Sequence, residues 1–86
     1  MPNRPAIIRR LDAALAKMRE RDMEVRAIYL NPDDWDAYNA AQSEAYGTPL
    51  VSFRYGLHEI RSTENSSIIY STHGVGVAVP KVAPHE

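Results

Sequence analysis

The sequence predicts an α+β fold with the element order α-β-α-β-β-β, in which two helices pack on a mostly antiparallel sheet. Three observations support this class. The chain opens on an amphipathic helical pattern, and an apolar run then stops at an Asn-Pro pair that begins a second helix. From residue 50 onward, β-branched and aromatic residues alternate with turn residues. Helices followed by several strands are typical of layered α+β domains.

The first helix is expected over residues 6–21. At about 100° per residue its apolar side chains share one arc roughly 120° wide, as in a helix that packs on a sheet. On one flank of this arc Arg10, Lys17 and Arg21 fall within about 40° of each other, and we call these three residues the basic ridge. The apolar arc consists of Ile7, Ile8, Leu11, Ala14, Leu15 and Met18.

The next strand and helix meet at an Asn-Pro junction. Residues 23–30 form a strand whose second half is apolar on both faces, which predicts an inner strand of the sheet. Asn31 can cap the following helix with its side-chain oxygen, and Pro32 suits the first helical position. Asp33 and Asp34 place negative charge beside the unpaired amides of the first turn.

The second helix is expected from Pro32 to about Tyr46. Its helical wheel directs Trp35 and Tyr38 inward, toward the core. The outward face is acidic and carries Asp33, Asp36 and Glu44. We call these three residues the acidic face.

The second half of the chain predicts an antiparallel meander, with His73-Gly74 as a two-residue hairpin loop. Its strands are expected at residues 50–55, 57–62, 68–72 and 75–79. The last strand carries valines on one face and the small residues Gly76 and Ala78 on the other, so that a helix or the backbone of a partner can pack closely. At an edge it is a template for pairing with another chain, and the alternative is a core strand beneath a helix.

Length and composition predict a single domain over residues 1–86, with loose ends at 1–5 and 82–86. A chain of this size buries a modest core, so a homodimer or a larger partner would add stability. There is no cysteine, and the N-terminal segment contains neither a signal peptide nor a membrane span, which favours a cytoplasmic location. The glycines match neither a phosphate loop nor a dinucleotide fingerprint, so no cofactor is predicted.

Charge is segregated along the chain. Residues 1–26 carry seven basic and four acidic side chains, a balance of +3, whereas the remaining residues carry three basic and seven acidic ones, a balance of −4. The basic ridge of Arg10, Lys17 and Arg21 therefore supports an alternative function in nucleic-acid binding or regulation. The net charge of −1 is low for a dedicated binder, and a ridge of this kind is more often a solvated helix face.

A second alternative is a small, toxin-like ribonuclease that needs no metal. Such an enzyme needs a base, an acid and a cation, and these residue types occur in the sheet half as His58, Glu59, Arg61, Tyr70 and His73. His58 and Glu59 are neighbours and point to opposite faces of a strand, which counts against an acid–base pair. The histidines have no spacing typical of zinc ligands. We therefore predict no catalytic residue and no metal site, and interpret the chain as a protein without enzymatic activity.

Part of the chain resembles a known family. The run from Ile28 to Trp35, then Tyr55-Gly56 with Ile60 and Ser62, and then Ile68-Ile69-Tyr70 are similar in order to motifs of tailed-phage major capsid proteins. In that family an asparagine-proline-acidic-tryptophan helix start precedes a Gly-x-Pro-Val-x-x-Ser strand. The match covers residues 27–72. The chain lacks the proline after Gly56 and is too short for the spine helix and extended arm, so the resemblance implies phage or prophage origin and not shell assembly.

The function predicted from these observations is protein binding, by an accessory protein that binds or blocks a host or phage protein. Five tyrosines and one tryptophan supply side chains that commonly anchor interfaces. The acidic face could meet a basic partner, such as a nucleic-acid-binding protein, and compete for its phosphate site. The predicted contact residues are Asp33, Asp36, Glu44, Tyr46 and Tyr55.

Overall fold

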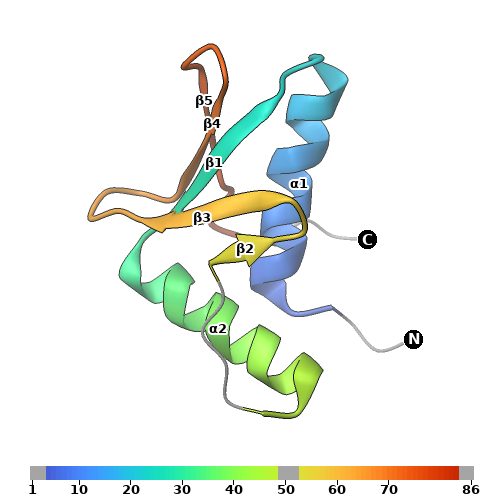
Figure 1. Cartoon of the computed structure of the whole chain (residues 1–86), viewed down its shortest axis with the longest axis vertical. Coiled ribbons are helices and arrows are strands. Elements are labelled where there is room, and N and C mark those ends of the chain that lie inside the picture. The colour runs from blue at the N-terminus through green and yellow to red at the C-terminus, as the bar shows by residue number, and fades with distance from the viewer. Residues whose placement is uncertain (1–3, 49–52, 84–86) are drawn as a thin grey trace.

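A computed structural model describes residues 4–48 and 53–83 of the chain. It contains two helices and a five-stranded mixed sheet, which confirms the predicted α+β class and the α-β-α order followed by strands, with one strand more than the order α-β-α-β-β-β counts (Figure 1). The elements are α1 (Ala6–Glu20), β1 (Val25–Leu30), α2 (Pro32–Tyr46), β2 (Arg54–Tyr55), β3 (His58–Ser62), β4 (Ile68–Ser71) and β5 (Gly76–Ala78). Residues 50–52 of the strand predicted at 50–55 lie outside the described residues, so only its end is seen, as β2.

Helix α1 buries the apolar arc that its sequence predicts. Leu11 and Met18 are fully covered, and the backbone amides of the first turn bond to the carbonyl of Pro5. Arg4 forms an ion pair with Asp12. Within the predicted loose ends, Arg4 and Pro5 are exposed but bonded to the helix, and residues 82–83 belong to no helix or strand. Residues 1–3 and 84–86 lie outside the described residues.

The capping prediction for α2 is confirmed. Asn31 has extended backbone geometry, and its side-chain oxygen accepts a hydrogen bond of 2.8 Å from the backbone N–H of Asp34. Pro32 occupies the first turn, where its missing N–H costs nothing. Gly47 ends the helix with φ of 73°, a left-handed conformation that residues with a Cβ rarely adopt.

The sheet has the strand order β2-β3-β1-β4-β5, so β1 lies at its centre as predicted. The predicted antiparallel meander is wrong in one respect, because β3 and β4 do not pair with each other. Strand β1 lies between them and pairs in parallel with β3. The other three pairings are antiparallel. Helix α2 thus forms part of a β-α-β connection, and the apolar strand β1 gains a neighbour on each side.

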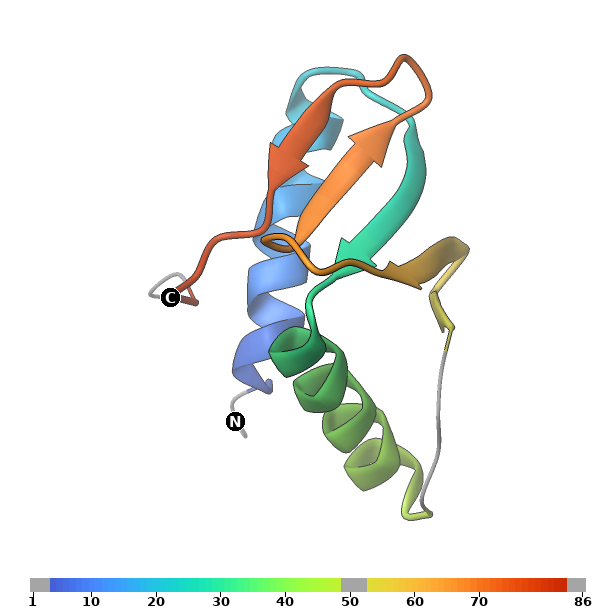
Figure 2. The ribbon, with the colours of Figure 1, turned by 90° about the vertical axis from the view of Figure 1, so that its left-hand side faces the viewer.

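The core lies between the two helices and one face of the sheet. Ile28 on β1, Ile60 on β3 and Ile69 on β4 are paired across the strands and buried together on this face. On the opposite face Tyr29 and Tyr70 meet edge to face, with ring centroids 5.5 Å apart. Figure 2 shows β1, β4 and β5 in front of α1, with this second face free of any helix that the structure describes. No helix of the described residues has the length and apolar character required to cross a membrane.

The β4–β5 hairpin turns through three residues and not the predicted two. The backbone N–H of Ser71 bonds to the carbonyl of Val75, which leaves residues 72–74 as the loop. Gly74 has φ of 83°, whereas His73 does not need a positive φ. A three-residue loop that ends in a left-handed glycine is a common hairpin form. The side-chain oxygen of Ser71 accepts hydrogen bonds from the backbone N–H groups of His73 and Val75.

Candidate protein interface

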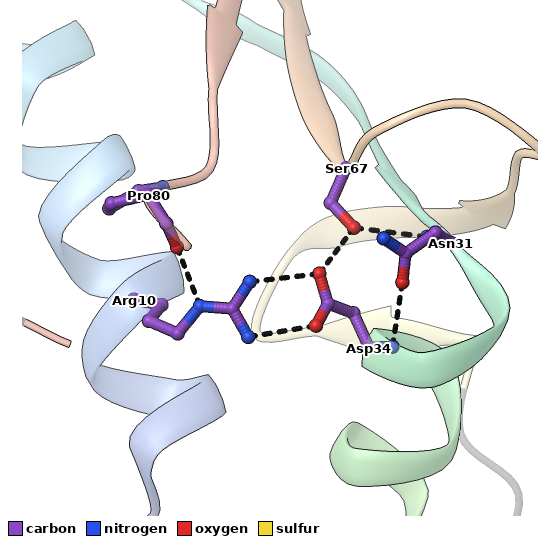
Figure 3. Close-up of polar contacts among 5 residues, drawn as sticks. All are labelled: Arg10, Asn31, Asp34, Ser67 and Pro80. Carbon is purple, nitrogen blue, oxygen red and sulfur yellow. Dashed lines mark hydrogen bonds and ion pairs between the residues drawn. The ribbon is translucent and has the colours of Figure 1, made fainter. Parts of the chain in front are cut away.

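The first turn of α2 joins four segments of the chain through one polar network (Figure 3). The two terminal guanidinium nitrogens of Arg10 donate to the two carboxylate oxygens of Asp34 at 2.8 and 3.0 Å. The hydroxyl of Ser67 donates to the same carboxylate at 2.6 Å and accepts from the backbone N–H of Asn31 at 3.0 Å. Nε of Arg10 donates to the carbonyl of Pro80 at 2.6 Å. Helix α1, helix α2, the β3–β4 loop and the segment after β5 are tied together here.

The charges of this network neutralise each other inside the protein. The Arg10 side chain is 14% exposed and that of Asp34 is 10% exposed. Burial by itself would raise the pKa of Asp34, but the hydrogen bonds from Arg10 and Ser67 and the charge of Arg10 outweigh it, so that the pKa is lowered. A bidentate pair with this geometry stabilises the ionised carboxylate. Asp34 is therefore a structural residue and not part of a contact surface.

The acidic face of α2 has the opposite character. Asp33, Asp36 and Glu44 are exposed, as predicted, and none of the three takes part in the ion pairs found among the described residues. The exposed Ala37 and Ala40 lie on the same outward side of the helix. Helix α2 contains no lysine or arginine. Its outward surface is thus uniformly negative, with small side chains that do not obstruct a close approach.

The two predicted contact tyrosines differ. Tyr46, in the last turn of α2, is 70% exposed, as expected for a residue near a turn. The suggestion that Tyr55 is exposed is wrong, because this residue is half-buried and its hydroxyl donates to a carboxylate oxygen of Asp12 at 2.6 Å. Burial and the hydrogen bond to Asp12 raise the pKa of Tyr55 to about 12. Tyr55 ties β2 to α1, and its hydroxyl is bonded within the molecule to Asp12 and Arg4.

The polar network around Asp34 removes one residue, Arg10, from the exposed basic ridge of α1. Lys17 and Arg21 are exposed, whereas Arg10 is committed to Asp34 and Pro80. The prediction that Arg10 contributes to a nucleic-acid surface is therefore wrong. The sequence contained no local signal for this pairing, since Arg10 and Asp34 are 24 positions apart.

The five residues of the ribonuclease hypothesis are divided among three places. Glu59 and Arg61 form an ion pair of 3.1 Å on the open face of the sheet, on the side that also carries Tyr70. His58 alternates to the other face, as predicted, and lines a groove of about 850 Å³ beside α1. His73 lies in the β4–β5 loop. Among the described residues, no group of three or more histidines and carboxylates is placed to hold a metal ion.

Comparison of the chain with protein-family models, curated proteins and solved structures found no match. The candidate interface is accordingly defined by the geometry of this chain alone.

Proposed function

We propose that this protein is a noncatalytic protein-binding module whose contact surface is the acidic face of α2. The observation that carries the proposal is the contrast between neighbouring acids on this helix. Asp34 is bonded to Arg10 and Ser67, whereas Asp33, Asp36 and Glu44 point outward and form none of the ion pairs found among the described residues.

The chemistry of this face favours a partner with a basic surface. Three carboxylates on one side of a helix attract a positive patch at long range and raise the association rate. The same charge pattern resembles a short stretch of phosphates, so a nucleic-acid-binding protein is a suitable partner and competition for its phosphate site a suitable mode of action. The capsid resemblance of residues 27–72 is the basis for proposing a phage or prophage origin, with a host or phage protein as the target.

The proposal can be tested by site-specific crosslinking. A photoreactive amino acid placed at Ala40 lies on the exposed side of α2 and replaces a side chain without bonds of its own among the described residues. In cells of the source organism we expect it to capture a basic protein. The triple variant Asp33→Lys, Asp36→Lys, Glu44→Lys should reduce that crosslink at least tenfold, because attraction becomes repulsion.

A matched control carries three reversals elsewhere. Glu20, Glu24 and Glu64 are exposed and lie outside α2, so Glu20→Lys, Glu24→Lys, Glu64→Lys changes the net charge equally. This control should retain the crosslink if the acidic face is the contact surface. An equal loss in both variants would show that only overall charge matters, and an undiminished crosslink in the α2 variant would overturn the proposal.

A further inference from the structure

Strand β5 forms one edge of the sheet, and its backbone has a defined free side (Figure 2). The carbonyl of Val75 accepts from Ser71, Val77 pairs with Ile69, and the N–H of Val79 donates to the carbonyl of Ser67. Because successive residues of an antiparallel strand alternate in direction, these three residues bond toward β4. The N–H and C=O groups of Gly76 and Ala78 therefore point outward, away from the sheet.

The side of β5 that bears Gly76 is already occupied from within the sheet. A Cβ on Gly76 would lie 2.6 Å from Cδ1 of Ile68 and 3.2 Å from Cε1 of Tyr70, and Tyr70 is its direct cross-strand partner. An aromatic residue that covers a cross-strand glycine is a known way to support edge strands. Glycine is therefore needed at position 76, because Ile68 and Tyr70 occupy the space that a side chain would fill. A partner can reach only the outward backbone of β5.

Apart from its short length, this edge lacks the usual protection against pairing. Natural edge strands are short, or carry charges, prolines or bulges that discourage added strands, and β5 has three residues. Residues 75–79 contain only valine, glycine and alanine, and the next proline along the chain, Pro80, lies beyond the strand. Val75, at the start of this run, is 52% exposed.

The flank of the edge is positively charged. Arg10 reaches the carbonyl of Pro80, just after β5, so the side of α1 that carries the basic ridge faces this end of the sheet. Lys17 and Arg21 lie on the same side of α1 and are exposed. Helix α1 and strand β5 run in opposite directions (Figure 2), so the C-terminal half of α1 lies toward the start of β5. Lys81, just beyond the strand, is exposed as well.

Three acids lie near the end of α1, and one of them, Glu20, is exposed close to Lys17 and Arg21 but takes part in none of the ion pairs found among the described residues. Asp22 and Glu24 line the groove on the other side of α1, together with Arg19 and His58. The basic side chains beside β5 are therefore left to attract negative charge from outside the molecule.

We infer that the edge of β5 binds an extended acidic segment of another protein, which adds to the sheet as a further strand. The outward groups of Gly76 and Ala78 supply main-chain hydrogen bonds, and Lys17, Arg21 and Lys81 select carboxylates on the segment. A second copy of this chain fits less well, because two-fold pairing of β5 with itself would bring two basic flanks together. This surface is separate from the acidic face of α2 and takes a partner of opposite charge.

Synthetic peptides test the inference directly. The probe is a ten-residue peptide of alternating glutamate and valine, and the control peptide alternates lysine and valine. With the acidic peptide, we expect amide hydrogen exchange at Gly76 and Ala78 to slow at least tenfold, because their N–H groups become bonded. With the lysine peptide, exchange at these amides should not change. A third peptide, acidic but N-methylated at every second residue on its bonding edge, should not bind.

Variants separate the backbone from the charges. Ala78→Pro removes one outward N–H and should weaken binding of the acidic peptide at least tenfold, whereas Ala78→Ser keeps the donor and should bind as the native protein does. Lys17→Glu with Arg21→Glu should weaken binding, and Arg19→Glu, on the groove side, should not. The N-methylated peptide gives the same test of the backbone without changing the protein, should Ala78→Pro fail to fold.

Two results would overturn the inference. Binding of the acidic peptide that depends on Lys17 and Arg21 but leaves exchange at Gly76 and Ala78 unchanged would show a helix contact and not an added strand. Protection of both amides that rises with protein concentration in the absence of peptide would identify a second copy as the occupant.

Discussion

Two neighbouring aspartates have different roles in this protein. Asp33 is exposed, whereas Asp34 is buried, capped through its backbone N–H by Asn31 and bonded through its carboxylate to Arg10 and Ser67. A one-residue step along a helix turns the side chain by about 100°, which is enough to move it from solvent to the interior. The residue type alone therefore does not show whether an aspartate of α2 is structural, as Asp34 is, or exposed to solvent, as Asp33 is.

We expect Asp34→Asn to lower the free energy of unfolding by about 2 to 3 kcal/mol, because removing one partner leaves Arg10 buried without its counter-charge. Asp33→Asn should lower it by less than about 1 kcal/mol, because this exposed residue loses only its interaction with the unpaired amides of the first turn. Urea unfolding at neutral pH measures both. Equal effects of the two substitutions would contradict the assigned roles.

The same residue predicts a pH dependence. The pKa of Asp34 is lowered in the folded protein, so its stabilising contribution is complete above its unfolded pKa of about 3.9 and is lost as the pH falls further. The difference in unfolding free energy between the native protein and Asp34→Asn should therefore be constant from about pH 5 to 7 and should shrink below about pH 4. A difference that persists undiminished in strong acid would argue against the ion pair.

At the scale of elements, helix boundaries were predictable and strand pairing was not. The Asn31 cap, Pro32 and Gly47 act within a few residues of the helix ends, so local sequence contains their whole physical basis. The insertion of β1 between β3 and β4 depends on contacts between residues 32 to 46 positions apart, from Ile28–Ile60 to Val25–Ser71. The apolar second half of β1 indicated an inner strand, but many strand orders satisfy that requirement.

The cap makes an element-scale prediction. Replacing Asn31 with Ala removes the acceptor for the N–H of Asp34 and should lower the unfolding free energy by about 1 kcal/mol. Replacing Asn31 with Ser, which retains a side-chain oxygen, should recover most of this loss. Thermal unfolding followed by circular dichroism compares the three proteins, and a serine variant as unstable as the alanine variant would contradict the capping role.

On the scale of the whole molecule, the two proposed surfaces lie on different elements and carry opposite charge. The acidic face lies on α2, and the basic flank lies on α1 beside β5. Residues 1–26 have an excess of basic side chains and the rest an excess of acidic ones, so a molecule of net charge −1 presents two distinct electrostatic surfaces.

This separation predicts that the two surfaces bind independently. Asp33→Asn, Asp36→Asn, Glu44→Gln should weaken crosslinking at Ala40, by less than the lysine variant does, yet leave the affinity for the glutamate–valine peptide within about twofold at 150 mM salt, where the Debye length is about 8 Å. Fluorescence anisotropy of a labelled peptide measures that affinity. A larger change would show that both partners share one surface.

The sequence by itself determined the fold class, both helices, the central position of β1 and the outward direction of Asp33, Asp36 and Glu44. These features follow from periodicity and capping, which act over one or two turns of the chain. Tertiary structure alone decided that Arg10 leaves the basic ridge to pair with Asp34, that Tyr55 bonds to Asp12, and that β5 becomes an edge. Each of these depends on which distant segments meet, because long-range pairing is set by the packing of the whole core and not by local sequence.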